Sequence, residues 1–280
     1  MILRALFLLL ASVSLAAAAK DAKGVPAPES KYIQLVGRAD SAITDARWKD
    51  AADLLNEAMR LEPANPSNVL LMSNLGMVQF YSGNDSLAIE TLTTAHNIAP
   101  ASVTVLQNRA RVYTTTGRLK RALGDYSEIL RLDSTLIEPR FYRAMLMFNS
   151  GDVTTAEDDL QYLKRHYPTD PSTKLLDATV LTYTGRFKEA IPLLTEIIAG
   201  KPTAGDYSMR ALCYLMTNQL QEASDDIQRG LAKDPVDGEL YLYRALLNQM
   251  RYRPEDARAD AALAVKHGVN SSRVKALGLM

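Results

Sequence analysis

Apolar and small residues recur along the chain with the spacing of one face of an α-helix. In one segment Ala122 is followed by Tyr126 and Ile129, at steps of four and three residues, which places the three side chains on a single helical face. The same spacing occurs in six further segments: Ala51/Leu55/Ala58, Ala88/Leu92/Ala95, Ala156/Leu160/Leu163, Ala190/Leu194/Ile197, Ala223/Ile227/Gly230 and Ala257/Ala261/Ala264. The pattern therefore predicts seven amphipathic helices of similar length.

A second helix precedes each of these, because a small residue stands twelve positions before each leading Ala. These residues are Ala39, Gly76, Ala110, Ala144, Ala178, Ala211 and Ala245. A turn residue separates the two halves in five units, namely Gly83, Gly117, Gly151, Gly185 and Asn218. Most units end in Pro or a polar stop, and most of these ends are 34 residues apart. Each unit thus reads as helix, tight turn, helix. One such hairpin cannot bury its apolar face alone, whereas stacked hairpins can.

The repeat resembles the tetratricopeptide repeat family. One unit carries the matching residues as Ala110, Tyr113, Gly117, Ala122 and Tyr126. The resemblance implies an all-α fold, a right-handed superhelical solenoid of seven tetratricopeptide-like helical hairpins over residues 32–269, followed by a short capping segment at 270–280. The first unit has Ala46 in place of the turn Gly, and the last has Tyr252, Arg253 and Pro254 around its turn.

The first residues have the pattern of a secretory signal peptide. Arg4 precedes a short apolar run, and Ala17 and Ala19 are the small residues expected before a cleavage site. We therefore predict a signal peptide at 1–19, a flexible linker at 20–31 and an exported mature chain. In a Gram-negative cell that chain would be periplasmic, and the alternative is a secreted protein. No later stretch is apolar enough to span a membrane after signal removal.

Charge and composition exclude several function classes. The 32 basic residues equal the 32 acidic ones, so the chain lacks the basic excess typical of nucleic-acid binding. No phosphate-binding loop, metal-spaced cluster or nucleophile motif is present, which predicts no enzyme activity, no cofactor and no metal. The three histidines, His96, His166 and His267, stand near the ends of second helices in different units. Cys213 lies in an apolar stretch and is predicted to be a buried core residue.

Arg and Asp recur together at a fixed spacing in four of the seven units. The pairs are Arg109 with Asp125, Arg143 with Asp159, Arg210 with Asp226, and Arg244 with Asp260, each sixteen residues apart. Their shared spacing predicts structural ion pairs between the two helices of a hairpin. An alternative pairing joins Asp125 to Arg143 of the next unit.

The resemblance also implies that the first helices line the inner, concave face of the superhelix. Carried onto this chain, it gives these partner-binding residues: Met77, Phe80, Tyr81, Gln107, Arg111, Phe141, Met145, Phe148, Tyr183, Leu212, Met216, Leu246 and Met250, together with Leu215, Leu242, Asp40 and Thr44. For each residue the alternative is a place in the core between hairpins. Such a strip, rich in Met and aromatic residues, suits a protein or peptide partner of varied sequence. We therefore expect an exported interaction scaffold or adaptor that acts in envelope assembly or as a chaperone-like protein. The alternative is a self-associating framework protein, in which the chain forms homo-oligomers.

Overall fold

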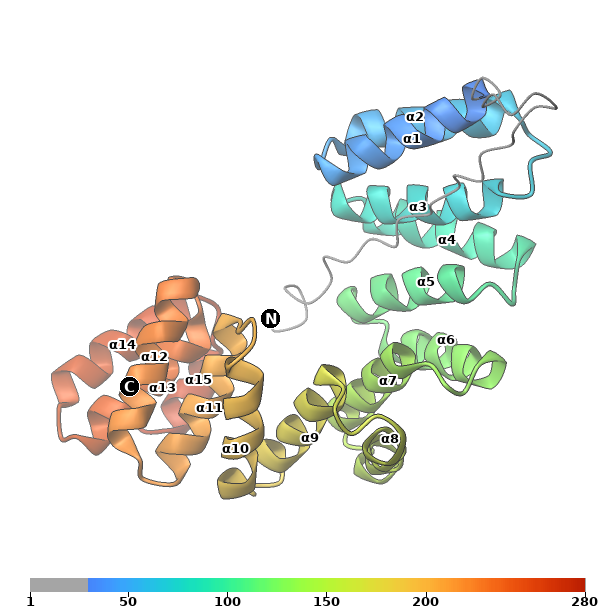
Figure 1. Cartoon of the computed structure of the whole chain (residues 1–280). Coiled ribbons are helices and arrows are strands. Elements are labelled where there is room, and N and C mark those ends of the chain that lie inside the picture. The colour runs from blue at the N-terminus through green and yellow to red at the C-terminus, as the bar shows by residue number, and fades with distance from the viewer. Residues whose placement is uncertain (1–29, 280) are drawn as a thin grey trace. The chain divides into compact units, whose positions relative to one another are not determined.

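The computed structural model describes residues 30–279, and this part of the chain forms fifteen α-helices (Figure 1). The predicted signal peptide and residues 20–29 of the predicted linker lie outside the described residues. The helices are α1 Lys31–Thr44, α2 Trp48–Leu61, α3 Asn68–Tyr81, α4 Asp85–Ile98, α5 Val103–Thr115, α6 Leu119–Leu132, α7 Ile137–Ser150, α8 Val153–His166, α9 Pro171–Tyr183, α10 Phe187–Ile198, α11 Ala204–Met216, α12 Leu220–Lys233, α13 Gly238–Met250, α14 Pro254–Lys266 and α15 Ser271–Ala276.

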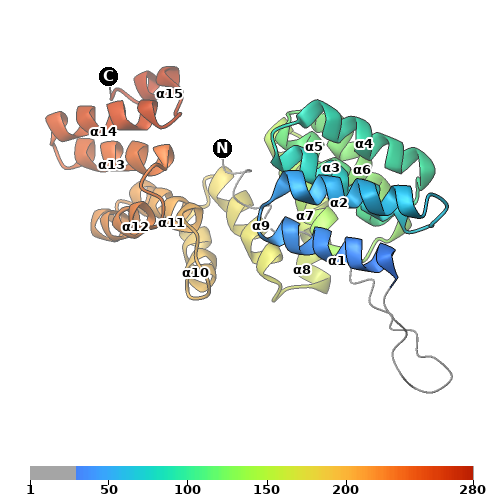
Figure 2. The same cartoon turned by 90° about the horizontal axis from the view of Figure 1, so that it is seen from above.

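The chain divides into two compact units, of which the first ends at Leu146 and the second begins at Met147, inside α7. In the first unit the hairpins α1/α2, α3/α4 and α5/α6 follow one another (Figure 1). In the second unit the hairpins α9/α10, α11/α12 and α13/α14 do the same, and Figure 2 shows them from above. In each of these six hairpins the odd-numbered helix is the first helix.

First helices pack against first helices of the next hairpin. α3 contacts α5 in the first unit, and α11 contacts both α9 and α13 in the second. Within a hairpin, small residues allow the axes of the two helices to come close at their crossing point. At Gly76, for instance, an added Cβ would lie 2.6 Å from Leu92 Cγ. The predicted core positions of the second helices are buried throughout, except that Ile197 is half-buried.

The turns within the hairpins share one backbone conformation, whatever residue occupies them. Four carry a glycine with positive φ, at Gly83, Gly117, Gly151 and Gly185. Where glycine is missing, the same left-handed conformation is adopted by Ala46 (φ 55°), Asn218 (φ 61°) and Tyr252 (φ 56°). The sequence departures in the first and last hairpins are therefore changes of residue and not of turn geometry.

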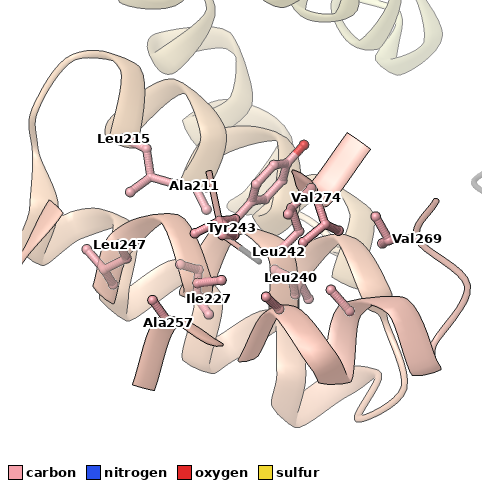
Figure 3. Packing of buried hydrophobic residues seen from close by; sticks show 14 of the residues in the cluster. Ala211, Leu215, Ile227, Leu240, Leu242, Tyr243, Leu247, Ala257, Val269 and Val274 are labelled. Carbon is pink, nitrogen blue, oxygen red and sulfur yellow. The ribbon is translucent and has the colours of Figure 1, made fainter. Parts of the chain in front are cut away.

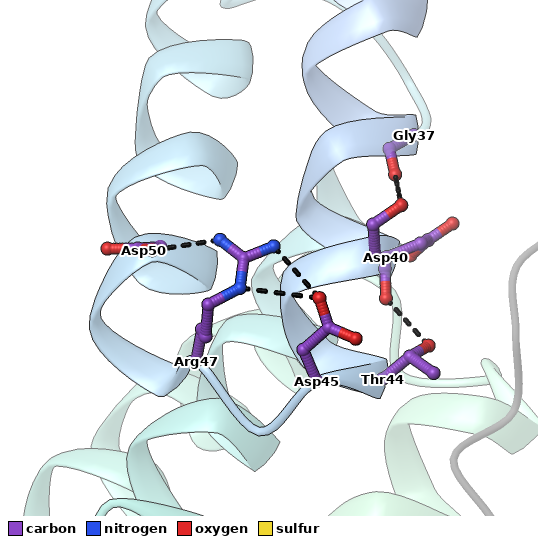
Figure 4. A network of polar contacts seen from close by, with 7 residues as sticks. Gly37, Asp40, Thr44, Asp45, Arg47 and Asp50 are labelled. Carbon is purple, nitrogen blue, oxygen red and sulfur yellow. Dashed lines mark hydrogen bonds and ion pairs between the residues drawn. The ribbon is translucent and has the colours of Figure 1, made fainter.

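A polar network surrounds the turn at Ala46 (Figure 4). Arg47 donates from Nη1 to Asp50 at 2.9 Å and from Nη2 to Asp45 at 3.1 Å. Arg47 thus links the residues on either side of the turn, although all three side chains are solvent-exposed. Solvent therefore screens these contacts, and they contribute little to stability.

The last helix covers the end of the second unit. Val274 of α15 is fully buried, and Leu279 beyond it is 2% exposed. Both join a cluster that includes Leu240 and Tyr243 of α13 (Figure 3). The segment predicted to cap the repeats therefore packs onto the final hairpin.

Candidate interaction surface

Five of the residues predicted on the partner-binding face lie in the core, so those assignments are wrong. Met77 is 2% exposed, Phe141 5% and Phe148 3%. Met77 packs with Leu92 and Val112, because α3 lies against both α4 and α5.

Phe141 and Phe148 each lie edge-on to another aromatic ring. Phe141 contacts Tyr142 with ring centroids 5.2 Å apart, and Phe148 contacts Tyr183 at 5.4 Å. Leu215 and Leu242, assigned to the same face, are buried as well. Contacts between neighbouring first helices cover the middle of this face in the second unit, which the sequence pattern could not distinguish from an open surface.

Most of the remaining predicted residues of the first unit are half-buried, and several contact other side chains of the same unit. Arg111 forms an ion pair with Glu138 at the start of α7. Tyr81 stacks on Trp48 with ring centroids 5.2 Å apart and also contacts Phe80.

The other predicted positions of the first unit are mainly polar or half-buried. Gln107 and Met145 are half-buried. Asp40 accepts a hydrogen bond at its backbone carbonyl from Thr44 Oγ1 at 2.9 Å (Figure 4). The first unit therefore presents a largely polar, internally bonded strip at these positions.

The second unit is different, because three large apolar side chains are exposed at one repeated position. Tyr183 is 66% exposed, Met216 58% and Met250 39%, and we call these three residues the apolar row. Each is the last residue of its first helix, in α9, α11 and α13 respectively. Since α11 contacts both α9 and α13, the row runs across three neighbouring helices.

A half-buried shelf lies one helical turn before the row. Leu212 and Leu246 stand four residues before Met216 and Met250, on the same helical face. Both leucines pack partly against the cluster of Ala211, Leu215 and Leu242. Met216 and Met250 thus follow partly packed leucines on the same helical faces.

Tyr252 follows Met250 by two residues, is also exposed, and was not among the predicted residues. Its side chain is 93% exposed although its backbone adopts the left-handed conformation. That conformation costs a residue with a Cβ roughly 1–2 kcal/mol relative to the right-handed one. The sequence carried a signal, since the equivalent position in four other hairpins is Gly.

The predicted ion pairs of three hairpins are present in the structure. Arg109 donates from Nε and Nη2 to Asp125, at 2.9 and 2.7 Å. The corresponding contacts join Arg210 to Asp226, at 2.7 and 2.8 Å, and Arg244 to Asp260, at 2.9 and 2.5 Å.

Each of these three guanidinium groups also lies over a tyrosine ring. The rings are Tyr113, Tyr214 and Tyr241, with the guanidinium carbon 5.0–5.7 Å from the ring centroid. The pairs hold hairpin helices together and are not a binding site. The pair of Arg143 and Asp159 would cross from one unit to the other and stays a prediction.

The described residues hold no cluster of His, Cys, Asp and Glu that could bind a metal ion. In the sequence-adjacent carboxylates Asp225 and Asp226, the second is buried in its ion pair while the first is exposed. Cys213 is fully buried, and its Sγ lies 3.4 Å from Thr182 Oγ1. Burial raises the pKa of the Cys213 thiol, which makes it a poor nucleophile.

Between residues 30 and 279, no helix has both the length and the apolar content needed to cross a lipid bilayer.

No model of a known protein family matches the chain. A curated protein of Cryptococcus neoformans var. grubii, the tetratricopeptide repeat and J domain-containing co-chaperone DNJ1, is 27% identical over 100 residues. The match takes in 36% of this chain and only 19% of the co-chaperone.

Solved structures resemble the chain over most of its length. A tetratricopeptide repeat protein from Parabacteroides merdae has a TM-score of 0.71 and 27% identity, and the alignment covers 88% of this chain and 96% of that one. A chain of the APC/C hetero-tetramer Cut9–Hcn1 has a TM-score of 0.69 at 15% identity, covering 87% and 54%. PilW, a type IV pilus biogenesis factor, has a TM-score of 0.62 at 15% identity, covering 76% and 100%. The chain therefore has the fold of the tetratricopeptide-repeat solenoids, built from consecutive helical hairpins.

Proposed function

We propose that the protein is an interaction scaffold that binds a segment of another protein on the second unit. The observation that carries this proposal is the apolar row, because Tyr183, Met216 and Met250 occupy one position on three neighbouring helices and remain exposed. Side chains that only fill the core would not recur at a solvent-exposed position. A row of this kind gains free energy when a partner removes it from water.

The chemistry of the row suits a partner with regularly spaced apolar side chains. Neighbouring packed helices lie roughly 8–10 Å apart, so successive members of the row are separated by about that distance. Two turns of a partner α-helix, or three residues of an extended segment, span a similar length. Met216 and Met250 add flexible, polarizable side chains that adapt to partners of varied sequence. Each apolar side chain that becomes fully buried contributes about 1.5–3 kcal/mol before the costs of association.

We also propose that the protein works outside the cytoplasm. Support comes from residues 1–19, which have the charged start, apolar run and small-residue pair of a signal peptide. In a Gram-negative cell the place of action would be the periplasm, and elsewhere the protein would be secreted. Similarity to a co-chaperone and to a pilus biogenesis factor favours a chaperone-like or envelope-assembly role.

The second candidate is self-association through the same row, which would make the protein a structural framework. Sedimentation velocity over a range of concentrations distinguishes the two. A scaffold for another protein stays monomeric as concentration rises, whereas a framework protein forms larger species.

The experiment that tests the proposed function is capture from the native envelope fraction. Mature wild-type protein and Met216→Glu are immobilised in parallel, and the bound proteins are identified by mass spectrometry. The proposal expects at least one protein retained by the wild type and lost with Met216→Glu. Identical sets of captured proteins would overturn it.

A further inference from the structure

The end of the apolar row carries features that specify the partner's chemistry. Gln249 donates from Nε2 to the backbone carbonyl of Gly278 at 3.3 Å, which brings the chain after α15 against the end of α13. Three exposed apolar side chains belong to these two segments: Met250 at 39%, Tyr252 at 93% and Leu277 at 38%. We call Met250, Tyr252 and Leu277 the terminal cluster.

The left-handed backbone conformation of Tyr252 costs free energy. Side-chain packing within residues 30–279 does little to offset that cost. A positive φ is uncommon for a bulky residue, and an almost fully exposed ring gains little from packing. Glycine serves at this position in four other hairpins, asparagine in a fifth and alanine in a sixth, so Tyr252 is the one bulky residue among them. A strained residue held in solvent is typical of a contact residue.

Cationic residues stand next to the terminal cluster in sequence. The acidic residues nearest to them in sequence form no ion pair with them. Arg253 and Lys275 are exposed and have no acidic partner in residues 30–279. Arg251 donates to the backbone carbonyl of Leu220 at 2.9 Å, so its charge is also uncompensated by a carboxylate.

Two acids stand close by in sequence, at the start of α14. Glu255 forms an ion pair with Arg258, with Oε1 and Nη1 2.9 Å apart. Asp256 is exposed in the first turn of α14, where the helix dipole stabilises its negative charge.

We propose that the terminal cluster docks an acidic amphipathic helix of the partner protein, in which apolar side chains form one face and Asp or Glu border it. The apolar residues cover Met250, Tyr252 and Leu277, and the carboxylates face Arg251, Arg253 and Lys275. This inference rests on the proposed function and names the partner's chemistry at one end of the row.

A protein segment suits this surface better than an anionic membrane. Asp256 is exposed three residues after Arg253, and a flat anionic bilayer that approached the cations would also meet its negative charge. A peptide can place its carboxylates over the arginines and avoid the acidic side chains.

The test uses the chain from residue 20 onward and three fluorescein-labelled peptides in anisotropy titrations. One peptide combines Leu and Phe with Glu in an amphipathic helical pattern, the second has Lys for Glu, and the third has Ser for Leu and Phe. We expect the Glu peptide to bind, with affinity falling as salt is raised, and the other two to bind at least about tenfold more weakly. Equal binding of the Lys peptide would overturn the proposal.

Two variants locate the binding site on the protein. Tyr252→Gly should weaken binding of the Glu peptide about tenfold while raising Tm, because the strain is relieved. A residue with only a structural role would not move the two readouts in opposite directions. Arg253→Glu should also weaken binding about tenfold.

Matched controls lie in the loops between hairpins. Lys201→Glu makes the same charge change in the α10–α11 loop, and Val236→Ser removes a side chain that is 58% exposed in the α12–α13 loop. Both should bind the Glu peptide as the wild type does. Wild-type binding by Tyr252→Gly would overturn the proposal.

The remaining arms separate this inference from the proposed function. Vesicles of phosphatidylserine and phosphatidylcholine are sedimented with the protein, and Tyr252-dependent binding to them in place of the peptide would overturn the proposal. If the Glu peptide binds through Tyr252 but envelope capture ignores Met216, the proposed function fails and the acidic-segment inference stands. If capture depends on Met216 but the Glu peptide does not bind, only the acidic-segment inference fails.

Discussion

Arg210 donates two hydrogen bonds, from Nε and Nη2, to the two carboxylate oxygens of Asp226 across the hairpin α11/α12. Both side chains are nearly buried, at 9% and 2% exposed. Arg210 also donates from Nη1 to Thr195 Oγ1 of the preceding hairpin at 2.9 Å. The pair therefore connects three helices, and removal of one partner leaves the other charge buried without its counterion.

A double-mutant cycle on this pair should show strong coupling. Arg210→Ala or Asp226→Ala alone should lower the free energy of unfolding by about 3–5 kcal/mol, because each leaves a buried charge unpaired. The double variant should cost little more than either single variant. Urea unfolding followed by circular dichroism provides the measurement. As a control, the exposed pair Arg258 and Glu255 should show a coupling of about 0.5 kcal/mol or less. Additive losses at Arg210 and Asp226 would contradict the pairing.

The backbone geometry that the hairpin turns share predicts opposite effects of two substitutions on stability. Gly117, with φ 74°, should lose about 1 kcal/mol of stability when replaced by Ala, since a Cβ is strained there. Ala46→Gly relieves the same strain at φ 55° but increases the entropy of the unfolded chain, so its gain should be smaller. No heavy atom lies within 4 Å of a Cβ built at Gly117, so crowding does not complicate the comparison. Thermal unfolding of both variants checks the signs, and a stabilising Gly117→Ala would contradict this account.

His96, near the end of α4, should make stability depend on pH. Its pKa lies below the ordinary value of 6.5, first because burial disfavours the charged imidazolium and second because Arg109 is close. The imidazole Nδ1 is buried and has no hydrogen-bond partner among residues 30–279. Between the folded and the unfolded pKa the unfolded chain binds more protons, so stability should fall as the pH drops below about 6.5.

The contribution of His96 is isolated by difference. The stability of wild type and His96→Gln is measured by urea unfolding at pH values above and below about 6.5. The stability of the wild type relative to His96→Gln should fall as the pH falls, because only the wild type loses the free energy linked to the neutral imidazole. A constant difference between them would show that His96 titrates normally.

The cap formed after α14 predicts a contrast between two leucines close in sequence. Leu279 is 2% exposed in the buried cluster that contains Leu240 and Tyr243, so Leu279→Ala should cost about 2 kcal/mol or more. Leu277 is 38% exposed, and Leu277→Ala should change stability by about 0.5 kcal/mol or less. Urea unfolding of both variants provides the test. Equal costs would mean that this segment does not pack on α13 and α14.

The sequence predicted the hairpins because their repeat is enforced by packing. A residue such as Ala122 must be small to let helices approach, and Tyr126 four residues later must face the same core. The Arg–Asp spacing was equally informative, since opposite charges that recur together at a fixed distance in the sequence are expected to pair with each other. These features depend on contacts within one hairpin or between neighbours.

The exposed face was harder to predict, because exposure depends on how far neighbouring helices cover each position. Met77 and Met216 stand on related faces of their helices, yet the first is covered by α4 and α5 and the second stays exposed at its helix end. Composition gives no warning of this difference, since both residues are methionine. Tyr252 was missed for a different reason. Its place in the turn predicts the backbone conformation but does not predict that the side chain is exposed.

Isothermal titration of the captured partner against wild type and Met216→Glu tests the central claim most directly. The account predicts at least about tenfold weaker binding by Met216→Glu, because the partner would bury an unpaired charge. Its melting temperature should be nearly unchanged, since Met216 is 58% exposed in the free protein. Val236→Glu, which places a charge at an equally exposed site in the α12–α13 loop, should bind as the wild type does. Wild-type affinity of a folded Met216→Glu protein would contradict the claim that the apolar row is the partner-binding surface.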